Sequence, residues 1–356
     1  MVWRRCSTAT AGWHGTELGL EEALSVILIL AEPADPWAML VHQELLRRSV
    51  EDLFWIQPAQ LLDRVLLNWP VGIGSPLLPG SLVVDGTTRS LTNLTGVFAR
   101  LSFPLLLELE DLSAQDRDYV VKEATAAWLA FLNALPCAVV NRPIPGGRPT
   151  LLAGSPVQSQ RARAQGFMLP PSRCTSSRAD AILQYSAWNE RAYLKPLGSH
   201  EPGIFLHAHD GVEQICRVME RQAVSMQAIP HGQRVTVYVV GEEIVATVLQ
   251  PSEDAPQRME MPLVPVERCL DLVGDLGLTF AECQFIVTPE GPIYCLDVSS
   301  APGFWCCPQE VQPQIVCHLV EYLSEMRSLS RHDSLDGPNG RSGARERLCE
   351  TRSPQR

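Results

Sequence analysis

The stretch Leu276–Trp305, LGLTFAECQFIVTPEGPIYCLDVSSAPGFW, is the most informative part of this 356-residue sequence. Two short apolar runs flank a Pro-Glu-Gly-Pro turn, which predicts a β-hairpin with strands over Phe280–Thr288 and Ile293–Ser299. An acidic residue, Asp297, lies near the end of the second strand. Because carboxylate oxygens are common ligands of Mg²⁺, the hairpin presents a candidate metal-binding acid.

A second segment, Ala192–Ser199 with the sequence AYLKPLGS, combines a strand-like apolar run with a lysine and a Gly-Ser loop. Lysine is scarce in this chain, which contains only Lys122 and Lys195. A strand lysine, the backbone N–H groups of a Gly/Ser loop and acidic strands further on suit a nucleoside triphosphate with its magnesium. The alternative is a strand-end lysine that extends into water.

Composition excludes several classes of protein. The formal net charge of −11 argues against a chain whose main surface binds nucleic acid. The longest early apolar run, Val26–Ala31, is too short to cross a bilayer, and no apolar segment of a secretory signal follows the N-terminal arginines. The eleven cysteines include no CxxC pair, which indicates reduced thiols. We therefore expect a cytoplasmic protein without a membrane partner.

The first part of the chain alternates between strand and helix patterns, which favours an α/β domain with a mostly parallel sheet. Strands are expected at Val26–Ala31, Leu53–Ile56, Ser81–Val84, Gly96–Leu101 and Ala138–Asn141, and helices at Asp35–Arg48 and Asp116–Leu135.

The second part is richer in strands. We expect strands at Arg191–Leu197, Ser225–Ile229, Arg234–Val240, Ile244–Leu249 and Met259–Val264, besides the hairpin. Helices are expected at Val157–Gln165, Arg178–Tyr185, Asp210–Arg221, Pro265–Leu276 and Pro313–Ser324.

Several segments in this order resemble the ATP-grasp superfamily. They are VILILAEPAD, GVFARL and DRDYVVKEATAAWLAFLNALPCAVVNRP in the first part, and PEGPIYCLDVSSAPGFW at the end. The branch they resemble is that of carboxylate–amine ligases that extend ribosomal proteins with glutamate or cross-link ribosomal peptides. The resemblance covers about residues 25–327.

The resemblance implies an α/β and α+β fold, in which a Rossmann-like pre-grasp domain precedes a two-subdomain ATP-grasp fold. The implied divisions are an N-terminal extension (1–24), the pre-grasp domain (25–141), a central or lid subdomain (142–229), a C-terminal subdomain (230–327) and a disordered tail (328–356).

The resemblance also implies a reaction. A substrate carboxylate attacks the γ-phosphate of ATP, with Mg²⁺ present, and an amine captures the resulting acyl phosphate. The implied partners are ATP and a carboxylate or amine substrate of peptide type. A homo-oligomer is also implied, since relatives of this type often pair.

The resemblance assigns nucleotide-binding roles by position. Lys195 matches the strand lysine that contacts the phosphates, and a glycine-rich loop and a hinge would complete the site. The loop residues are Gly198, Ser199 and Gly203, and the hinge residues whose backbone would read the adenine edge are Gln227, Ala228 and Ile229. An ordinary hairpin loop and a buried strand are the alternatives for these two segments.

Arginines are the candidates for two further positions. Arg234 precedes by two residues the position, Thr236, where the family carries a phosphate-binding arginine. Residues i and i+2 of a strand share a face, so Arg234 is the candidate catalytic residue, with a solvated strand arginine as the alternative. No lysine stands at Ser155–Pro156, where the family has one, and Arg161 or Arg163 would have to replace it.

The metal site departs furthest from the family, whose hairpin carries aspartate, glutamate and asparagine where this chain has Gln284, Asp297 and Ser299. A four-residue turn over Pro289–Pro292 would pair Thr288 with Ile293. Counting back places four candidate ligands on one face: Glu282, Gln284, Asp297 and Ser299. We expect Glu282 to restore a second carboxylate for one Mg²⁺ ion; the alternative is a solvated Glu282 beside a decayed site.

Three functions follow. The first is an ATP-dependent carboxylate–amine ligase, and the second is a divergent homologue that binds nucleotide or peptide with weak or no catalysis. The third, a dinucleotide-binding oxidoreductase, is disfavoured because no GxGxxG follows Val26–Ala31.

Overall fold

The structure, a computed structural model, describes residues 26–50, 52–62, 64–68, 80–101, 103–105, 107, 109–143, 156–197, 203–250, 257–259, 263–304 and 307–332. The predicted N-terminal extension lies outside the described residues. The tail predicted from Ser328 is wrong at its start, because helix α7 runs over Gln312–His332. The rest of the predicted tail lies outside the described residues.

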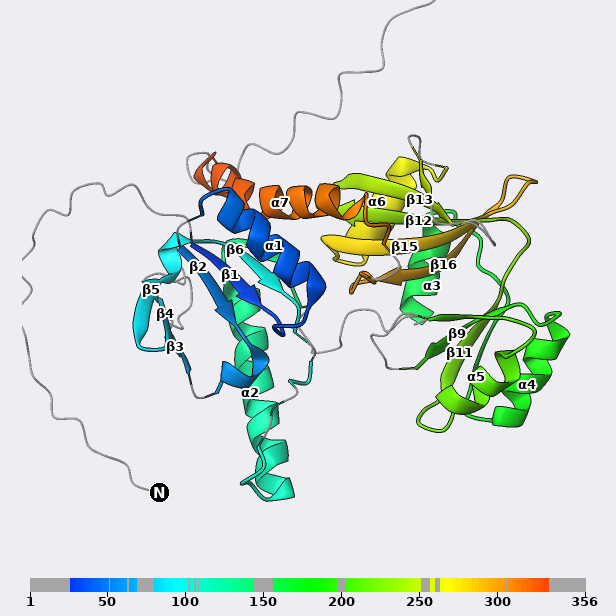
Figure 1. Ribbon diagram of the computed structural model, residues 1–356, viewed down its shortest axis with the longest axis horizontal. Coiled ribbons are helices and arrows are strands. Elements are labelled where there is room, and N and C mark those ends of the chain that lie inside the picture. The colour runs from blue at the N-terminus through cyan, green and yellow to red at the C-terminus, as the bar shows by residue number, and fades with distance from the viewer. Residues whose placement is uncertain are drawn as a thin grey trace, which may run out of the picture.

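The first part of the chain forms a four-stranded parallel sheet in the order β2-β1-β6-β7 (Figure 1). Its strands are β1 (Val26–Leu30), β2 (Asp52–Ile56), β6 (Leu94–Ala99) and β7 (Ala138–Val140). Helices α1 (Pro36–Arg47) and α7 pack on one face and α2 (Ala114–Ala134) on the other. Because both faces are covered, β1 is buried along its whole length, as its continuous apolar sequence predicts.

A small antiparallel sheet adjoins the parallel sheet, in the order β3-β4-β5. Its strands are β3 (Val65–Asn68), β4 (Ser81–Val84) and β5 (Thr87–Ser90). A turn at Asp85–Gly86 joins β4 and β5, and both residues have positive φ. The sequence did not predict β5, because its sequence TTRS is polar and mostly exposed.

The middle of the chain forms a four-stranded antiparallel sheet in the order β10-β9-β11-β8. Its strands are β8 (Ser172–Thr175), β9 (Ala192–Pro196), β10 (Ile204–Leu206) and β11 (Val224–Ala228). Helices α4 (Arg178–Ala187) and α5 (Gly211–Val218) cover one face, where they enclose a separate apolar core. The other face is free of these helices and positions the candidate site.

The last part forms a five-stranded sheet in the order β14-β13-β12-β15-β16. Its strands are β12 (Gln233–Val240), β13 (Glu243–Gln250), β14 (Gln257–Met259), β15 (Phe280–Val287) and β16 (Ile293–Ser299). Helices α3 (Pro156–Ala164) and α6 (Val266–Asp275) cover one face. The predicted strand Met259–Val264 differs at both described ends: β14 begins earlier, at Gln257, and Val264 packs in the core beside α6 without forming a strand. Residues 260–262 lie outside the described residues.

The five-stranded sheet and the parallel sheet share one apolar core. Trp37 of α1 packs edge-on against Phe280 and Phe304, and its Nε1 donates to Pro302 O at 3.0 Å. Asn141, directly after β7, hydrogen-bonds the backbone of Phe280 through both ends of its amide. These contacts fix the first part of the chain on the five-stranded sheet.

Candidate active site

An ion pair joins the four-stranded antiparallel sheet to the five-stranded sheet. Lys195 Nζ of β9 donates to Asp297 Oδ2 of β16 at 2.7 Å, and the side chains are 4% and 3% exposed. The structure therefore brings together the two residues on which the sequence analysis mainly relied. Because water does not reach these two charges, each must be neutralised by the other.

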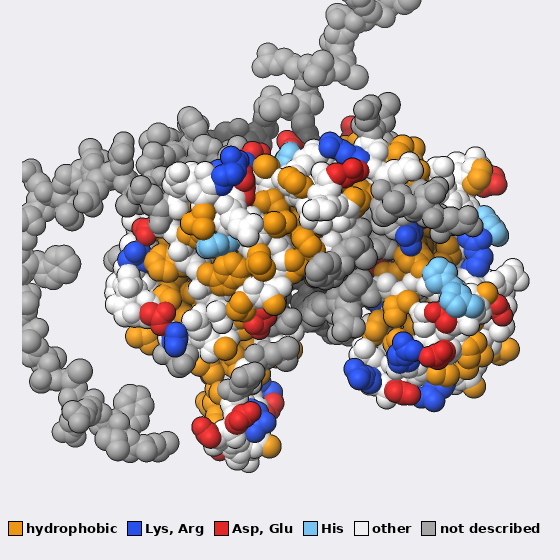
Figure 2. Space-filling model, viewed as in Figure 1, with side chains coloured by type: hydrophobic (Ala, Val, Ile, Leu, Met, Phe, Trp, Pro, Cys, Tyr) orange, Lys and Arg blue, Asp and Glu red, His pale blue; other side chains and the backbone are white. Residues whose placement is uncertain are grey.

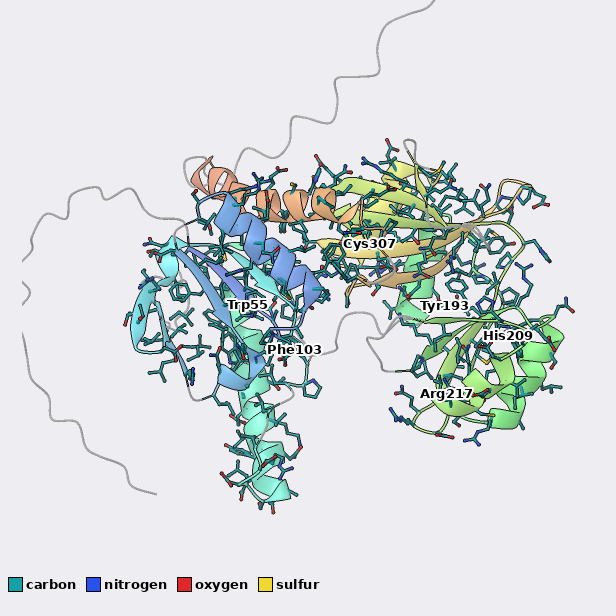
Figure 3. The ribbon with its side chains drawn as sticks, viewed as in Figure 1. Trp55, Phe103, Tyr193, His209, Arg217 and Cys307 are labelled. Atoms are coloured by element: carbon teal, nitrogen blue, oxygen red, sulfur yellow. The ribbon has the colours of Figure 1, made fainter. Side chains whose placement is uncertain are left out.

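Two further side chains, which the sequence analysis missed, complete the surroundings of Asp297. The Tyr193 hydroxyl donates to Asp297 Oδ2 at 3.3 Å, and Figure 3 labels Tyr193 at the junction of the two sheets. Gln158 Nε2 of α3 lies 3.3 Å from Asp297 Oδ1 and donates to Val298 O at 2.6 Å. Tyr193 was detectable from the sequence, since it lies two residues before Lys195 on the same strand face.

Two buried polar sheet faces meet at this junction. On the four-stranded sheet, Lys195 pairs with Ser225 and Tyr193 pairs with Gln227, so all four side chains share a face. Lys195, Ser225 and Gln227 are buried. Across the junction, the five-stranded sheet presents another set of buried polar residues: Thr236, Glu282, Gln284 and Asp297. Burying polar groups is costly, so such a concentration indicates a binding site.

The predicted hairpin register is confirmed at the candidate metal ligands. Gln284 pairs with Asp297, and Glu282 pairs with Ser299. The turn itself differs from the prediction, since Val287 rather than Thr288 pairs with Ile293. A β-bulge between Gln284 and Phe285 shifts the register by one residue and restores the predicted pairs.

Glu282 is fixed rather than solvated, with 3% of its surface exposed. Gly303 N donates to Glu282 Oε2 at 2.8 Å, and Gln284 Nε2 donates to Oε1 at 2.8 Å. Burial raises the pKa of Glu282, and the nearby Asp297 acts in the same direction, while the hydrogen bonds from Gln284 and Gly303 oppose the rise. The structure thus excludes the solvated alternative for Glu282.

The oxygen atoms at this junction fit one Mg²⁺ ion. Gln284 Oε1 and Thr236 Oγ1 are buried, pair across neighbouring strands, and accept no hydrogen bond within the described residues. With the carboxylates of Asp297 and Glu282 they form an oxygen-rich donor set of the kind that Mg²⁺ selects. Ser299 is less available, because its Oγ accepts from Ala301 N at 3.2 Å. In the described part of the chain, no group of three or more His, Cys, Asp or Glu residues forms a metal site.

Arg234 lies at the same junction. Its guanidinium carbon is 4.2 Å from the ring centroid of Phe205 on β10, so it contacts the four-stranded sheet from β12. Arg161 and Arg163 are both exposed, and the residue of α3 that reaches Asp297 is Gln158. The suggestion that either arginine replaces the missing lysine is therefore not supported by their positions.

The predicted hinge lies at the end of β11. Ala228 N donates to Pro171 O at 2.9 Å, and Ile229 N donates to Arg191 O at 3.1 Å. These two N–H groups are engaged in the sheet, whereas the buried Gln227 Oε1 has no hydrogen-bond partner within the described residues.

The predicted glycine-rich loop is only partly described. Gly198 and Ser199 lie outside the described residues, and Gly203 precedes β10. Gly203 N donates to the Tyr193 hydroxyl at 3.0 Å.

Among the described residues, neither histidines nor cysteines gather into a metal site. The rings of His207 and His209 stack with centroids 6.0 Å apart. Figure 2 shows histidine side chains in pale blue, with Lys and Arg side chains in blue nearby, on the surface of the lobe at the right. Cys307 is buried, and Cys306 lies outside the described residues. The eight cysteines that the structure describes are all free thiols. No described helix is both long and apolar enough to cross a membrane.

No protein-family model and no curated protein sequence matches the chain. Solved structures do resemble it. The macrocyclase MdnC bound with precursor peptide MdnA, from Microcystis aeruginosa MRC, has a TM-score of 0.63 at 17% identity, with 84% of this chain and 99% of MdnC covered.

Two further structures give similar values. A Chryseobacterium gregarium RiPP-associated ATP-grasp ligase, in complex with ADP and a leader and core peptide, has a TM-score of 0.61 at 15% identity, covering 85% and 97% of the two chains. The ATP-grasp ligase PsnB, complexed with a minimal-precursor variant, Mg and ADP, has a TM-score of 0.60 at 18% identity, covering 85% and 99%. The expected fold class is confirmed: the chain has the fold of the ATP-grasp ligases.

Proposed function

We propose that the chain is an ATP-dependent ligase that activates a carboxylate as an acyl phosphate and joins it to an amine on a peptide-like substrate. The observation that carries the proposal is the junction of two buried polar sheet faces, bridged by Lys195 and Asp297. ATP-grasp structures with the same fold contain ADP, Mg and precursor peptides. We also propose that residues 25–141 form the pre-grasp domain, and that 142–229 and 230–327 form the two subdomains that enclose the nucleotide.

Lys195 is the proposed phosphate contact. In the structure its ammonium neutralises Asp297, so nucleotide binding would exchange this partner for a phosphate oxygen. The exchange releases the Asp297 carboxylate for a cation. Arg234 would add positive charge near the terminal phosphate, where charge develops as the carboxylate attacks.

Asp297 and Glu282, with the oxygens of Gln284 and Thr236, would hold one Mg²⁺ ion. Ser299 is the weakest of the proposed ligands, because its hydroxyl already accepts a backbone hydrogen bond. When bound, Mg²⁺ neutralises the phosphate charge that develops during transfer. The chain's own contribution is to fix the two carboxylates, through Gly303 N for Glu282 and through Gln158 and Tyr193 for Asp297.

The remaining proposed contacts concern the base and the loop. Gln227, Ala228 and Ile229 would border the adenine, with oxygens as the main contacts. Gly198, Ser199 and Gly203 stay predicted phosphate-loop residues. The free thiols support a cytoplasmic location, and a homo-oligomer stays a prediction that size-exclusion chromatography with light scattering would check.

A second candidate, a homologue that binds nucleotide or peptide without catalysis, is favoured by one observation. Gln284 donates its amide to Glu282, so an amide stands where the family has a carboxylate. This substitution leaves fewer negative charges to hold a metal ion.

One experiment separates the two candidates. The full chain receives ATP, Mg²⁺, hydroxylamine and synthetic peptides with glutamate or aspartate side chains. The carboxylate oxygen attacks the γ-phosphorus and ADP leaves; hydroxylamine then displaces phosphate from the acyl group to form a hydroxamate. The ligase proposal expects equal amounts of ADP and hydroxamate, lost in Arg234→Gln. Nucleotide binding without either product supports the second candidate, and no nucleotide binding contradicts both.

A further inference from the structure

The buried hydroxyl of Tyr193 connects Gly203, the residue before β10, with Asp297 of β16. Its Oη accepts the N–H of Gly203 at 3.0 Å and donates to Asp297 Oδ2 at 3.3 Å. A phenol hydroxyl carries one hydrogen and can also accept a hydrogen bond. Because it accepts from Gly203, its own hydrogen is available for Asp297.

The contact with Gly203 depends on the absence of a side chain there. A Cβ atom on Gly203 would lie 2.2 Å from Tyr193 Cζ and 2.4 Å from its Oη. Gly203 has no positive φ, so the requirement for glycine comes from this close approach and not from backbone conformation. The tyrosine ring and the residue before β10 thus fit together only with glycine at position 203.

Phe205 extends this arrangement to Arg234. It pairs with Tyr193 across β9 and β10, and the two ring centroids are 4.8 Å apart. The Arg234 guanidinium lies over the Phe205 ring at 4.2 Å. Stacking of this kind holds a guanidinium in a fixed plane while its N–H groups remain directed outward. The two rings therefore lie between the acid of β16 and the arginine of β12.

We propose that Tyr193 and Phe205 are the positioning residues of the site. The Tyr193 hydroxyl orients the Asp297 carboxylate, and the Phe205 ring orients the Arg234 guanidinium. This inference rests on the proposed function, because it assigns Asp297 to the metal ion and Arg234 to the terminal phosphate. Neither aromatic residue touches the reacting groups; each acts through the charged residue that it holds.

The two halves of the proposal make different predictions. A carboxylate that has lost one of its orienting donors binds a cation less well but leaves the base and the phosphates of the nucleotide unaffected. An arginine that has lost its stacking surface discriminates less between ATP and ADP, because only ATP carries the terminal phosphate. A general loosening of the fold would instead weaken ATP and ADP binding together.

Tyr193→Phe tests the hydroxyl. We expect the Mg²⁺ concentration that half-saturates ATP binding to rise about tenfold, the size of one hydrogen bond to a charged group. Without nucleotide, the Gly203 amide should exchange its hydrogen faster than in the wild type. The matched control is Tyr185→Phe, since Tyr185 is a second buried tyrosine beside the same sheet, and its hydroxyl has no hydrogen-bond partner within the described residues. This control should change neither quantity.

Phe205→Leu tests the ring. Calorimetric titration should show the ratio of ATP to ADP affinity falling about tenfold, as in Arg234→Gln. The double variant Phe205→Leu/Arg234→Gln should fall no further, because both changes remove the same interaction. Phe205→Tyr keeps the ring and should retain the wild-type ratio.

Failure of this inference differs from failure of the proposed function. If the wild type binds Mg·ATP while Tyr193→Phe keeps the wild-type Mg²⁺ requirement, or Phe205→Leu keeps the ATP to ADP ratio, the corresponding positioning role is wrong and the proposed function stands. If Gly203 exchange is unchanged in Tyr193→Phe, the hydroxyl contact is overturned even without a nucleotide. If the wild type binds no nucleotide, both the function and the positioning roles that rest on it are wrong.

Discussion

Lys195 Nζ lies 2.7 Å from Asp297 Oδ2, although the two residues belong to different sheets. Their side chains are 4% and 3% exposed, so the pair is desolvated. A buried pair of this kind contributes little net stability against an apolar pair, but removing one partner leaves an uncompensated charge. Variants of this ion pair can therefore separate two properties of the junction: its stability and its ability to bind a ligand.

Lys195→Met should lower the free energy of unfolding by about 3–5 kcal/mol, because Asp297 stays buried without its cation. Chemical denaturation measures the loss. The chain supplies a matched control in its other lysine: Lys122 pairs with Asp118 on the exposed surface of α2, and Lys122→Met should change stability by less than about 0.5 kcal/mol.

The double variant Lys195→Met/Asp297→Leu extends this test. It should recover most of the lost stability, since apolar side chains replace both charges. It should nevertheless fail to bind Mg·ATP, because the proposed phosphate and metal contacts are gone. A single Lys195→Met variant as stable as the wild type would contradict the buried ion pair.

Glu282→Ala should abolish the Mg²⁺ dependence of ATP binding, because it removes one of the two carboxylates at the junction. The measurement is the nucleotide-induced rise in melting temperature at increasing Mg²⁺ concentrations. Glu290→Ala, in the exposed turn of the same hairpin, is the control and should behave as the wild type. An unchanged Mg²⁺ response in Glu282→Ala would show that Glu282 is not a metal ligand.

The pH dependence of the stability of Glu44→Gln tests the ion pairs that Glu44 forms on α1. Hydrogen bonds from Arg47 and Arg48 lower the pKa of Glu44 from 4.5 to about 2. A lowered folded-state pKa gives stability that is present above pH 4.5 and is lost as the pH falls toward about 2. Glu44→Gln should therefore be less stable than the wild type by up to about 1 kcal/mol at neutral pH. Denaturation curves should converge near pH 2, and a constant difference would contradict the assigned ion pairs.

Asn141 should be sensitive to substitution in a graded way. Its Oδ1 accepts from Thr279 N and Phe280 N, and its Nδ2 donates to Phe280 O and Ser300 O. Its φ of 50° also lies in the left-handed region. Asn141→Ala should lose at least about 2 kcal/mol of stability. The loss in Asn141→Gly should be smaller by about 1 kcal/mol, because glycine tolerates this φ. Equal losses would mean that backbone conformation contributes nothing at this position.

The sequence predicted the β15–β16 pairs near Asp297 correctly, although it placed the pairing next to the turn incorrectly. Counting by twos from a four-residue turn gave Gln284 opposite Asp297, and the structure has that pair. The count began one residue away from the true turn, and the bulge between Gln284 and Phe285 compensated. Bulges arise from packing and local twist, which strand periodicity does not encode.

The other side chains around Asp297 differ in how predictable they were. Tyr193 follows from strand alternation, because it lies two residues before Lys195. Gln158 does not, because the face that α3 turns toward β16 depends on tertiary packing, and its sequence PVQSQRARA has no clear apolar stripe. Arg161 and Arg163 were chosen only by their distance from the missing lysine. The sequence could not show that both are exposed, for the same reason.

The central claim is that this junction binds a magnesium–nucleoside triphosphate, and calorimetric titration of the folded wild-type chain with Mg·ATP tests it directly. We predict saturable binding of one nucleotide per chain, with a dissociation constant between about 1 μM and 1 mM, weakened at least tenfold in Asp297→Asn. Absence of ATP binding by the folded chain, with and without Mg²⁺, would contradict the account.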